Sequence, residues 1–312
     1  MKRWSQACFG LALAALSPTG ASAAPAPERP PLTSVSHIAV YAQDPAKAER
    51  FYVHDLGAVR LPDPEAASGA RYYVSPSQFV EVLPLPPGTV SLNRLAHIAL
   101  TTPDAEKMRA YLAAHKVAVP ASVKVAPDGS RWFSVTDPEG TEVQFMQPPT
   151  HLPDVPVNAL SDHIIHVGFI IHNRANEDRF YKDILGLRPY WEGGMHDDHR
   201  DWISMQLPDG HDWIEYMVVG TPDTKGVPAD MSAATLGILN HFSLGVRDTR
   251  VAYTLLWNGD RLQGQPETPK IGRDAKWQLN LFDPDGTRAE VMEFHAIGKP
   301  CCSPFAAPDP EK

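Results

Sequence analysis

The chain has few cysteines for its length, with three in 312 residues. Cys8 lies near the start, and Cys301 and Cys302 are adjacent. Neighbouring cysteines bridge each other only with strain, and no other partner is left once Cys8 is removed. A disulfide-stapled scaffold is therefore excluded. Exposed thiols in an unstructured tail, a soft-metal contact and an intermolecular redox contact remain open for this pair.

Positive charge and long apolar runs are also scarce. The formal net charge of −9 argues against nucleic acid as a partner. The apolar run at residues 8–16 is too short to span a bilayer. It follows Lys2 and Arg3 and precedes Ala21-Ser22-Ala23, a small-residue cleavage pattern. Residues 1–23 are therefore predicted to be a signal peptide, which makes the mature protein periplasmic or secreted. A disordered extension is the alternative.

One unusual feature occurs four times: a carboxylate or amide in the middle of an apolar strand pattern. The four polar residues are Glu81, Gln144, Glu215 and Glu290. Each lies 44 to 49 residues after a histidine that opens its own apolar strand; these are His37, His97, His166 and His241. A lone buried carboxylate is costly unless it is paired or bound to a metal. Four copies of one unit explain the spacing.

The first copy predicts a β-α-β-β-β unit. Residues 35–41 alternate as a strand. Asp44 then caps a short helix over residues 44–52 that begins with Pro45, and Gly57 suits its C-terminal end. Short strands follow, around residues 59–61, 70–74 and 78–83.

The remaining units open at residues 95, 164 and 239. Residues 147–160 are polar and Pro-rich, which marks a domain boundary. The predicted organisation is a linker over 24–34, one domain over 35–149, a second over 160–296 and a loose Pro-rich tail over 297–312.

Two further patterns recur. Phe51-Tyr52 with Leu56-Gly57 is echoed by Phe180-Tyr181 with Leu185-Gly186, and Asp-Pro-x-Gly turns begin at Asp137 and Asp283. With the four histidines, these residues resemble the vicinal oxygen chelate superfamily of glyoxalases, bleomycin resistance proteins and extradiol dioxygenases. The resemblance covers about residues 35–295. It implies an α+β fold of four βαβββ modules that form two domains, each a cupped mixed sheet around a divalent metal.

The resemblance also implies ligand sets from the first and last strands of paired modules. Consecutive pairing yields His166, Glu215, His241 and Glu290 in the second domain, and His37, Glu81, His97 and Gln144 in the first. Imidazole with carboxylate suits Zn, Ni, Co, Fe or Mn. Because glutamine is a weaker, neutral ligand, the first domain is either a second metal site or a retired copy that shapes the pocket. If modules one and four pair instead, the complete set is His37, Glu81, His241 and Glu290.

The leading functional prediction is an exported metal-dependent enzyme with lyase, isomerase or epimerase chemistry on a small oxygenated molecule. Glu215 or Glu290 would be the base. His199 lies in the polar stretch 193–201, which is either a lid that supplies a proton shuttle or a solvated loop.

Two alternatives come from the same resemblance. An extradiol-type dioxygenase would use His166, His241 and Glu290 on iron, but Glu215 would then take a position that oxygen and substrate need. A metal-free small-molecule-binding protein of the resistance type is the other. The predicted partner is a small-molecule substrate, without a membrane span, for a monomer or homodimer.

Overall fold

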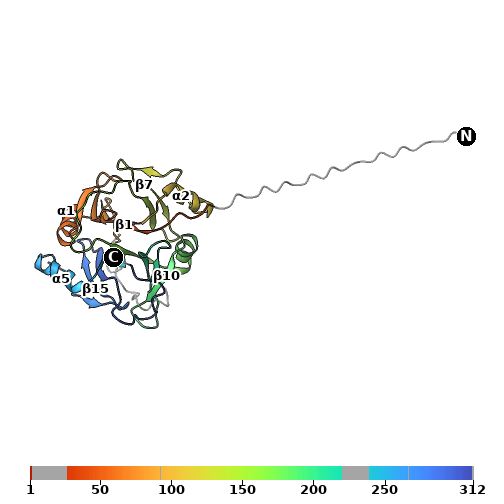
Figure 1. The fold of residues 1–312 in the computed structure, drawn as a ribbon. Coiled ribbons are helices and arrows are strands. Elements are labelled where there is room, and N and C mark those ends of the chain that lie inside the picture. The colour runs from red at the N-terminus through yellow and green to blue at the C-terminus, as the bar shows by residue number, and fades with distance from the viewer. Residues whose placement is uncertain (2–26, 92, 220–238, 266, 311–312) are drawn as a thin grey trace.

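The computed structural model describes Met1 and residues 27–91, 93–219, 239–265 and 267–310. The predicted signal peptide, apart from Met1, lies outside these residues, as does the start of the linker. Figure 1 shows two curved sheets, the first carrying α1, α2 and β7 and the second carrying α5, β10 and β15. None of the described helices is long and apolar enough to cross a membrane.

The first sheet spans two modules with the same order of elements. Its elements are β1 (Ser34–Ala42), α1 (Pro45–Glu49), η1 (Arg50–Asp55), β2 (Val59–Pro62), β3 (Ala70–Ser75), β4 (Gln78–Pro84), β5 (Leu95–Thr101), α2 (Ala105–Ala114), β6 (Lys124–Val125), β7 (Arg131–Thr136) and β8 (Glu142–Gln147).

The second sheet repeats this order. Its elements are β9 (Ile164–Ile171), α3 (Arg174–Asp178), η2 (Arg179–Ile184), β10 (Arg188–Gly193), β11 (Trp202–Gln206), β12 (Trp213–Val218), β13 (His241–Val246), α5 (Thr249–Asn258), β14 (Lys270–Ile271), β15 (Trp277–Phe282) and β16 (Arg288–Glu293).

Consecutive modules share a sheet. The strand orders are β2-β3-β4-β1-β5-β8-β7-β6 and β10-β11-β12-β9-β13-β16-β15-β14. Each first strand lies parallel to the last strand of its own module and antiparallel to the first strand of the neighbouring module. The predicted α+β fold of two cupped sheets is confirmed, and pairing of modules one and four is excluded.

The helix predicted over residues 44–52 is longer and changes form. The Asp44 carboxylate accepts hydrogen bonds from the amides of Ala46 and Lys47, as the capping pattern predicts. After Glu49 the chain widens into the π-helix η1, an insertion often found near functional sites. Gly57 then adopts a φ of 75°, where a side chain would be strained.

The two recurring sequence patterns contact each other across the domains. The hydroxyl of Tyr52, on η1, donates to the Asp283 carboxylate of the second domain at 2.9 Å. Reciprocally, Tyr181 on η2 donates to Asp137 of the first domain at 3.0 Å. Each Asp-Pro-x-Gly turn is therefore held by the Phe-Tyr helix of the other domain, which fixes how the two sheets pack.

This junction predicts a pH dependence of stability. Glu177, on α3, is fully buried beside Asp137, and burial together with the Asp137 charge raises the pKa of Glu177 to about 8. The unfolded chain loses this proton near pH 4.5, while the folded chain keeps it, so stability falls as the pH rises from about 5 to 8. Glu177→Gln should weaken that fall and raise the melting temperature at pH 8 by at least about 2 °C.

The measurement is thermal unfolding of both proteins at pH 5, 6.5 and 8. Glu49→Gln, at an exposed position on α1, is the control and should follow the wild-type curve. Parallel pH profiles for wild type and Glu177→Gln would contradict the assignment.

Candidate metal centre

The two histidines of the second domain face each other inside its cup. His166 lies on β9 and His241 on β13, which are antiparallel neighbours, with Ser243 opposite His166. Because side chains alternate along a strand, both imidazoles point to the same concave face. Their Nε2 atoms are 3.0 Å apart, and both side chains are buried.

Gly168 makes this arrangement possible. It pairs with His241 across the two strands. A Cβ atom at position 168 would lie 2.0 Å from the His241 ring, so any side chain there would displace the imidazole. The ring is also oriented from behind, since His241 Nδ1 lies 2.8 Å from the Leu239 carbonyl oxygen. That bond places a proton on Nδ1 and leaves the Nε2 lone pair directed into the cup.

Each glutamate reaches the histidine of the other module. Glu290 Oε2 lies 3.4 Å from His166 Nε2, and Glu215 Oε2 lies 3.3 Å from His241 Nε2. Ser204 donates to the other oxygen of Glu215 at 3.1 Å. The ligand atoms of His166, His241 and Glu290 all lie within 4.8 Å of one another. The structure thus gathers all four predicted residues, with Glu215 at the edge of the most compact three.

Burial sets the charges of this cluster. It lowers the pKa of His166 and His241 well below the usual value. His241 adds to this effect for His166, and the charge of Arg288 adds to it for both. Burial also raises the pKa of Glu290 to about 7. Both imidazoles are therefore neutral at pH 7, which is the form that coordinates a metal ion.

The residues fit a divalent ion. Two ligand atoms at about 2.1 Å from one ion are about 3.0 Å apart when they subtend a right angle and about 3.4 Å apart in a tetrahedron. The observed separations of 3.0, 3.3 and 3.4 Å fall in this range. Two imidazoles with carboxylates suit Mn, Fe, Co, Ni or Zn more than Ca or Mg.

The first domain repeats the arrangement with changes. His37 Nε2 lies 3.0 Å from His97 Nε2, and Glu81 Oε2 lies 3.3 Å from His97 Nε2. These three residues form a second cluster of ligand atoms within 4.8 Å. Glu81 Oε2 is buried without a hydrogen-bond partner, as expected of a metal ligand.

A buried cation that the sequence analysis missed lies beside this first cluster. Arg71 pairs with Glu81 in the β3–β4 register and forms ion pairs with Asp63 at 3.2 Å and Glu65 at 2.5 Å. The Gln144 amide donates to Glu65 at 2.9 Å. Only the position of Arg71 beside two tyrosines in a strand pattern could have flagged it. Its positive charge is balanced by these two carboxylates.

His199 occupies a different position from the four ligands. Its ring lies 5.8 Å from that of His196, and its Nε2 is 3.5 Å from Asp198. The ligand-atom clusters among the described residues do not include it. The role of proton shuttle therefore stays a prediction.

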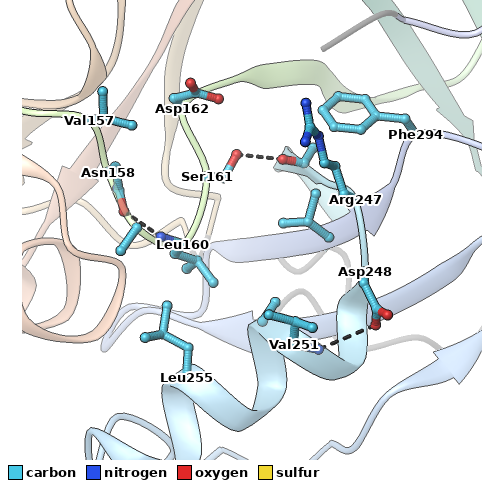
Figure 2. Close-up of a pocket in the computed structure, with 14 residues that line it drawn as sticks. Val157, Asn158, Leu160, Ser161, Asp162, Arg247, Asp248, Val251, Leu255 and Phe294 are labelled. Carbon is cyan, nitrogen blue, oxygen red and sulfur yellow. Dashed lines mark hydrogen bonds between the residues drawn. The ribbon is translucent and has the colours of Figure 1, made fainter.

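A surface pocket of about 310 Å³ lies between the interdomain linker and α5, lined in part by Asp162 and Leu255 (Figure 2). Its polar groups serve local structure. Ser161 donates to the Gly245 carbonyl at 2.7 Å, and Asp248 caps α5 by accepting from the Val251 amide. None of the four ligands lines it, so the cup of the second domain is the stronger candidate site.

Comparison with known proteins agrees with this geometry. Residues 34–145 match the family described as Glyoxalase/Bleomycin resistance protein/Dioxygenase superfamily. The second sheet repeats the topology of the first. Residues 34–145 therefore carry a domain of this family, and the second sheet, over residues 164–293, repeats its fold. No curated protein matches the chain.

Similar solved structures span two activities. The Mn(II)-bound glyoxalase from Novosphingobium aromaticivorans has a TM-score of 0.61 at 17% identity, covering 85% of this chain and 83% of that one. Homoprotocatechuate 2,3-dioxygenase from Brevibacterium fuscum has a TM-score of 0.60 at 16% identity, covering 86% and 82%. The 2,3-dioxygenase LapB from Pseudomonas sp. KL28 has a TM-score of 0.59 at 14% identity, covering 85% and 93%. At these identities the likeness is one of fold.

The site predicts metal binding that depends on the second cluster. Protein loaded with Mn, Fe, Co, Ni or Zn and then desalted should retain at least one ion per chain by elemental analysis. His241→Ala and Gly168→Ala should each lower the affinity of the second site by about tenfold or more, since one ligand is lost or displaced.

His172→Ala, at an exposed histidine, is the control and should bind like wild type. Wild-type protein that retains no ion after loading would favour the metal-free, resistance-type alternative. Retention that depends on His37 and not on His241 would move the site to the first domain.

Proposed function

We propose that the protein is a metal-dependent enzyme that performs redox-neutral lyase, isomerase or epimerase chemistry on a small oxygenated substrate in the second domain. The observation that carries the proposal is the pair of carboxylates flanking the two histidines. Glu215 and Glu290 approach His241 and His166 at 3.3 and 3.4 Å. Four protein ligands leave an octahedral ion about two positions, which suits a chelating substrate without a separate oxygen molecule.

His166, His241, Glu290 and Glu215 would hold the ion. When bound, it supplies Lewis-acid polarisation of a substrate carbonyl. Glu215 is the better candidate for the base, because its side chain is 13% exposed whereas that of Glu290 is 5% exposed. Ser204 donates to Glu215 Oε1 and keeps the carboxylate oriented, and Oε2 would receive the proton from a substrate carbon once this carboxylate no longer holds the ion.

The reaction class predicts proton exchange without oxygen. Solvent deuterium should enter hydroxy-ketone or diol-type substrates under anaerobic conditions, and chelation of the metal should abolish it. Glu215→Gln should lower turnover by about 10²-fold or more while metal content stays close to wild type, since general-base catalysis contributes that much. Ser204→Ala should have a smaller effect, because it only orients the base.

A second candidate function is extradiol-type ring cleavage. It is favoured by the compactness of His166, His241 and Glu290, which form a two-histidine, one-carboxylate group without Glu215. Oxygen consumption with catechols, with iron as the sole active metal, would replace the redox-neutral proposal. Activity that survives the removal of oxygen would eliminate this candidate.

We also propose that the protein is exported and cleaved after Ala23. The proposal is supported by Lys2, Arg3, the apolar run at 8–16 and the Ala-Ser-Ala pattern. Intact-mass analysis of periplasmic or secreted protein should give a mature chain that begins at Ala24. Mature protein that retains Met1 would contradict the proposal.

A further inference from the structure

A buried ammonium group lies in the cup of the second domain, close to the candidate metal centre. Lys276 immediately precedes β15 and has no exposed surface. Its Nζ atom donates to the Phe294 carbonyl at 2.7 Å, the Tyr190 hydroxyl at 2.8 Å and the Asp309 carboxylate at 2.8 Å. Tyr190 donates in turn to the same carboxylate oxygen. A buried ammonium is strongly destabilising without such a counter-charge.

Aromatic rings surround this ammonium and connect it to a metal ligand. Nζ lies 5.3, 5.2 and 5.1 Å from the ring centroids of Tyr190, Trp213 and Phe305. Trp213 also stacks on His166, with ring centroids 4.5 Å apart. The same indole therefore contacts the cation on one side and the imidazole on the other. An anion held by Lys276 would lie within the substrate cup.

The anion found there belongs to the C-terminal segment of the chain. The sequence predicts a loose tail, but in the structure residues 301–309 cross the cup from the β14–β15 turn to β10. The Cys301 amide donates to the Arg273 carbonyl, and the Ala306 amide donates to the Tyr190 carbonyl, both at 2.8 Å. Cys301 and Cys302 are joined to each other by a disulfide. Tail contact with both edges of the sheet closes the cup.

The residues around the ammonium belong to the core of the domain, whereas the carboxylate that pairs with it lies on the tail. Lys276, Tyr190 and Trp213 are buried. Every residue from 301 to 309 is half-buried or exposed. Both oxygens of the Asp309 carboxylate have partners, because the second oxygen lies 3.1 Å from His295 Nδ1. Phe305 and Ala307 pack against the aromatic cluster of Tyr190 and Trp213, so a competing ligand would have to replace these contacts as well as the Asp309 ion pair.

The first domain offers an internal comparison. There Phe79 stacks on His37 at 4.3 Å, and the Arg71 guanidinium lies 4.5 Å from the Phe79 ring. Its counter-charges, Asp63 and Glu65, come from the connection between β2 and β3 and are nearly buried. That cation is paired within its own domain. In the second domain the direct ion-pair partner of Lys276 is Asp309 of the tail, and the charges of Asp274 and Glu290 add to it.

We propose that Lys276 and Tyr190 form the subsite for a carboxylate of the substrate, and that Asp309 occupies this subsite as a stand-in. The inference deepens the proposed function and rests on it for the rest of the substrate. The implied substrate class is a small organic acid that carries a pair of adjacent oxygens for the histidine–glutamate cluster and a carboxylate for Lys276. Release of residues 301–309 would open the cup to it.

The test uses the full chain and carboxylate binding, with succinate as the probe and dimethyl succinate as its uncharged control. Trp213 beside Lys276 makes tryptophan fluorescence a direct readout, and calorimetry gives the affinity. Asp309→Asn should bind succinate about tenfold more tightly than wild type, because the internal competitor loses its charge. Asp198→Asn, at a loop position whose side chain is 84% exposed, is the matched control and should leave the affinity unchanged.

Lys276→Met and, as a milder change, Tyr190→Phe in the Asp309→Asn background should each lower succinate affinity by about tenfold or more. Melting curves show which variants are folded, and Tyr190→Phe keeps the test valid if Lys276→Met is not. Equal succinate binding by wild type and Asp309→Asn, or by Asp309→Asn and its Tyr190→Phe derivative, would overturn the subsite. Tighter binding of inorganic phosphate than of succinate would overturn the carboxylate assignment.

The measurements are made on metal-loaded and on chelator-treated protein. Succinate binding that persists without metal supports the subsite even if the proposed enzymatic function fails. Binding that requires the metal and is insensitive to Lys276 and Tyr190 places the carboxylate on the ion and contradicts the inference.

Discussion

Two neutral imidazoles held with their Nε2 atoms 3.0 Å apart are the constraint on which each domain depends. The separation follows from an antiparallel pairing of two first strands, each of which contributes one histidine to the concave face. Parallel pairing with the last strands then delivers the glutamates to the same face. The site is a consequence of sheet register, since a one-residue slip would turn a ligand to the opposite face.

The hydrogen bonds between the two domains are reciprocal. Tyr52 and Tyr181 emerge from π-helices and bind the turn aspartates of the opposite domain. Near β1 and β9, the Gln78 side-chain amide pairs with the backbone of Ile164 through two bonds of 2.9 Å. These contacts bury polar groups with their partners, which gives the interface one geometry.

The duplicated cups have diverged in how they balance buried charge. In the first, Arg71 is compensated within the domain by Asp63 and Glu65, and Gln144 replaces a carboxylate. In the second, Lys276 binds Asp309 of the tail directly, and both module-end residues are glutamates. In the first cup the buried cation is already paired with carboxylates of its own domain. In the second cup the cation is paired with a carboxylate of the tail, which a substrate carboxylate would replace in the proposed subsite.

Local patterns in the sequence determined much of the architecture. Strand alternation, the Asp44 cap, the Asp-Pro-x-Gly turns and the spacing of histidines to polar strand residues predicted four βαβββ modules and both ligand sets. Those features depend on neighbours within a few residues, or on a repeat that resembles a known family. They could not reveal which modules pair, because two arrangements satisfy the same periodicity and only strand register in the folded sheet separates them.

Tertiary structure alone decided the rest. Lys276 carries no local signature, because its partners Tyr190 and Asp309 are distant in the chain. The tail has the composition of a loose segment, yet its bonds to Arg273 and Tyr190 exist only once the two sheet edges approach each other. The sequence by itself determined which residues can bind a metal. The closing of the sheet decided which charges surround them, because burial and Coulomb interactions depend on distances that a linear pattern does not contain.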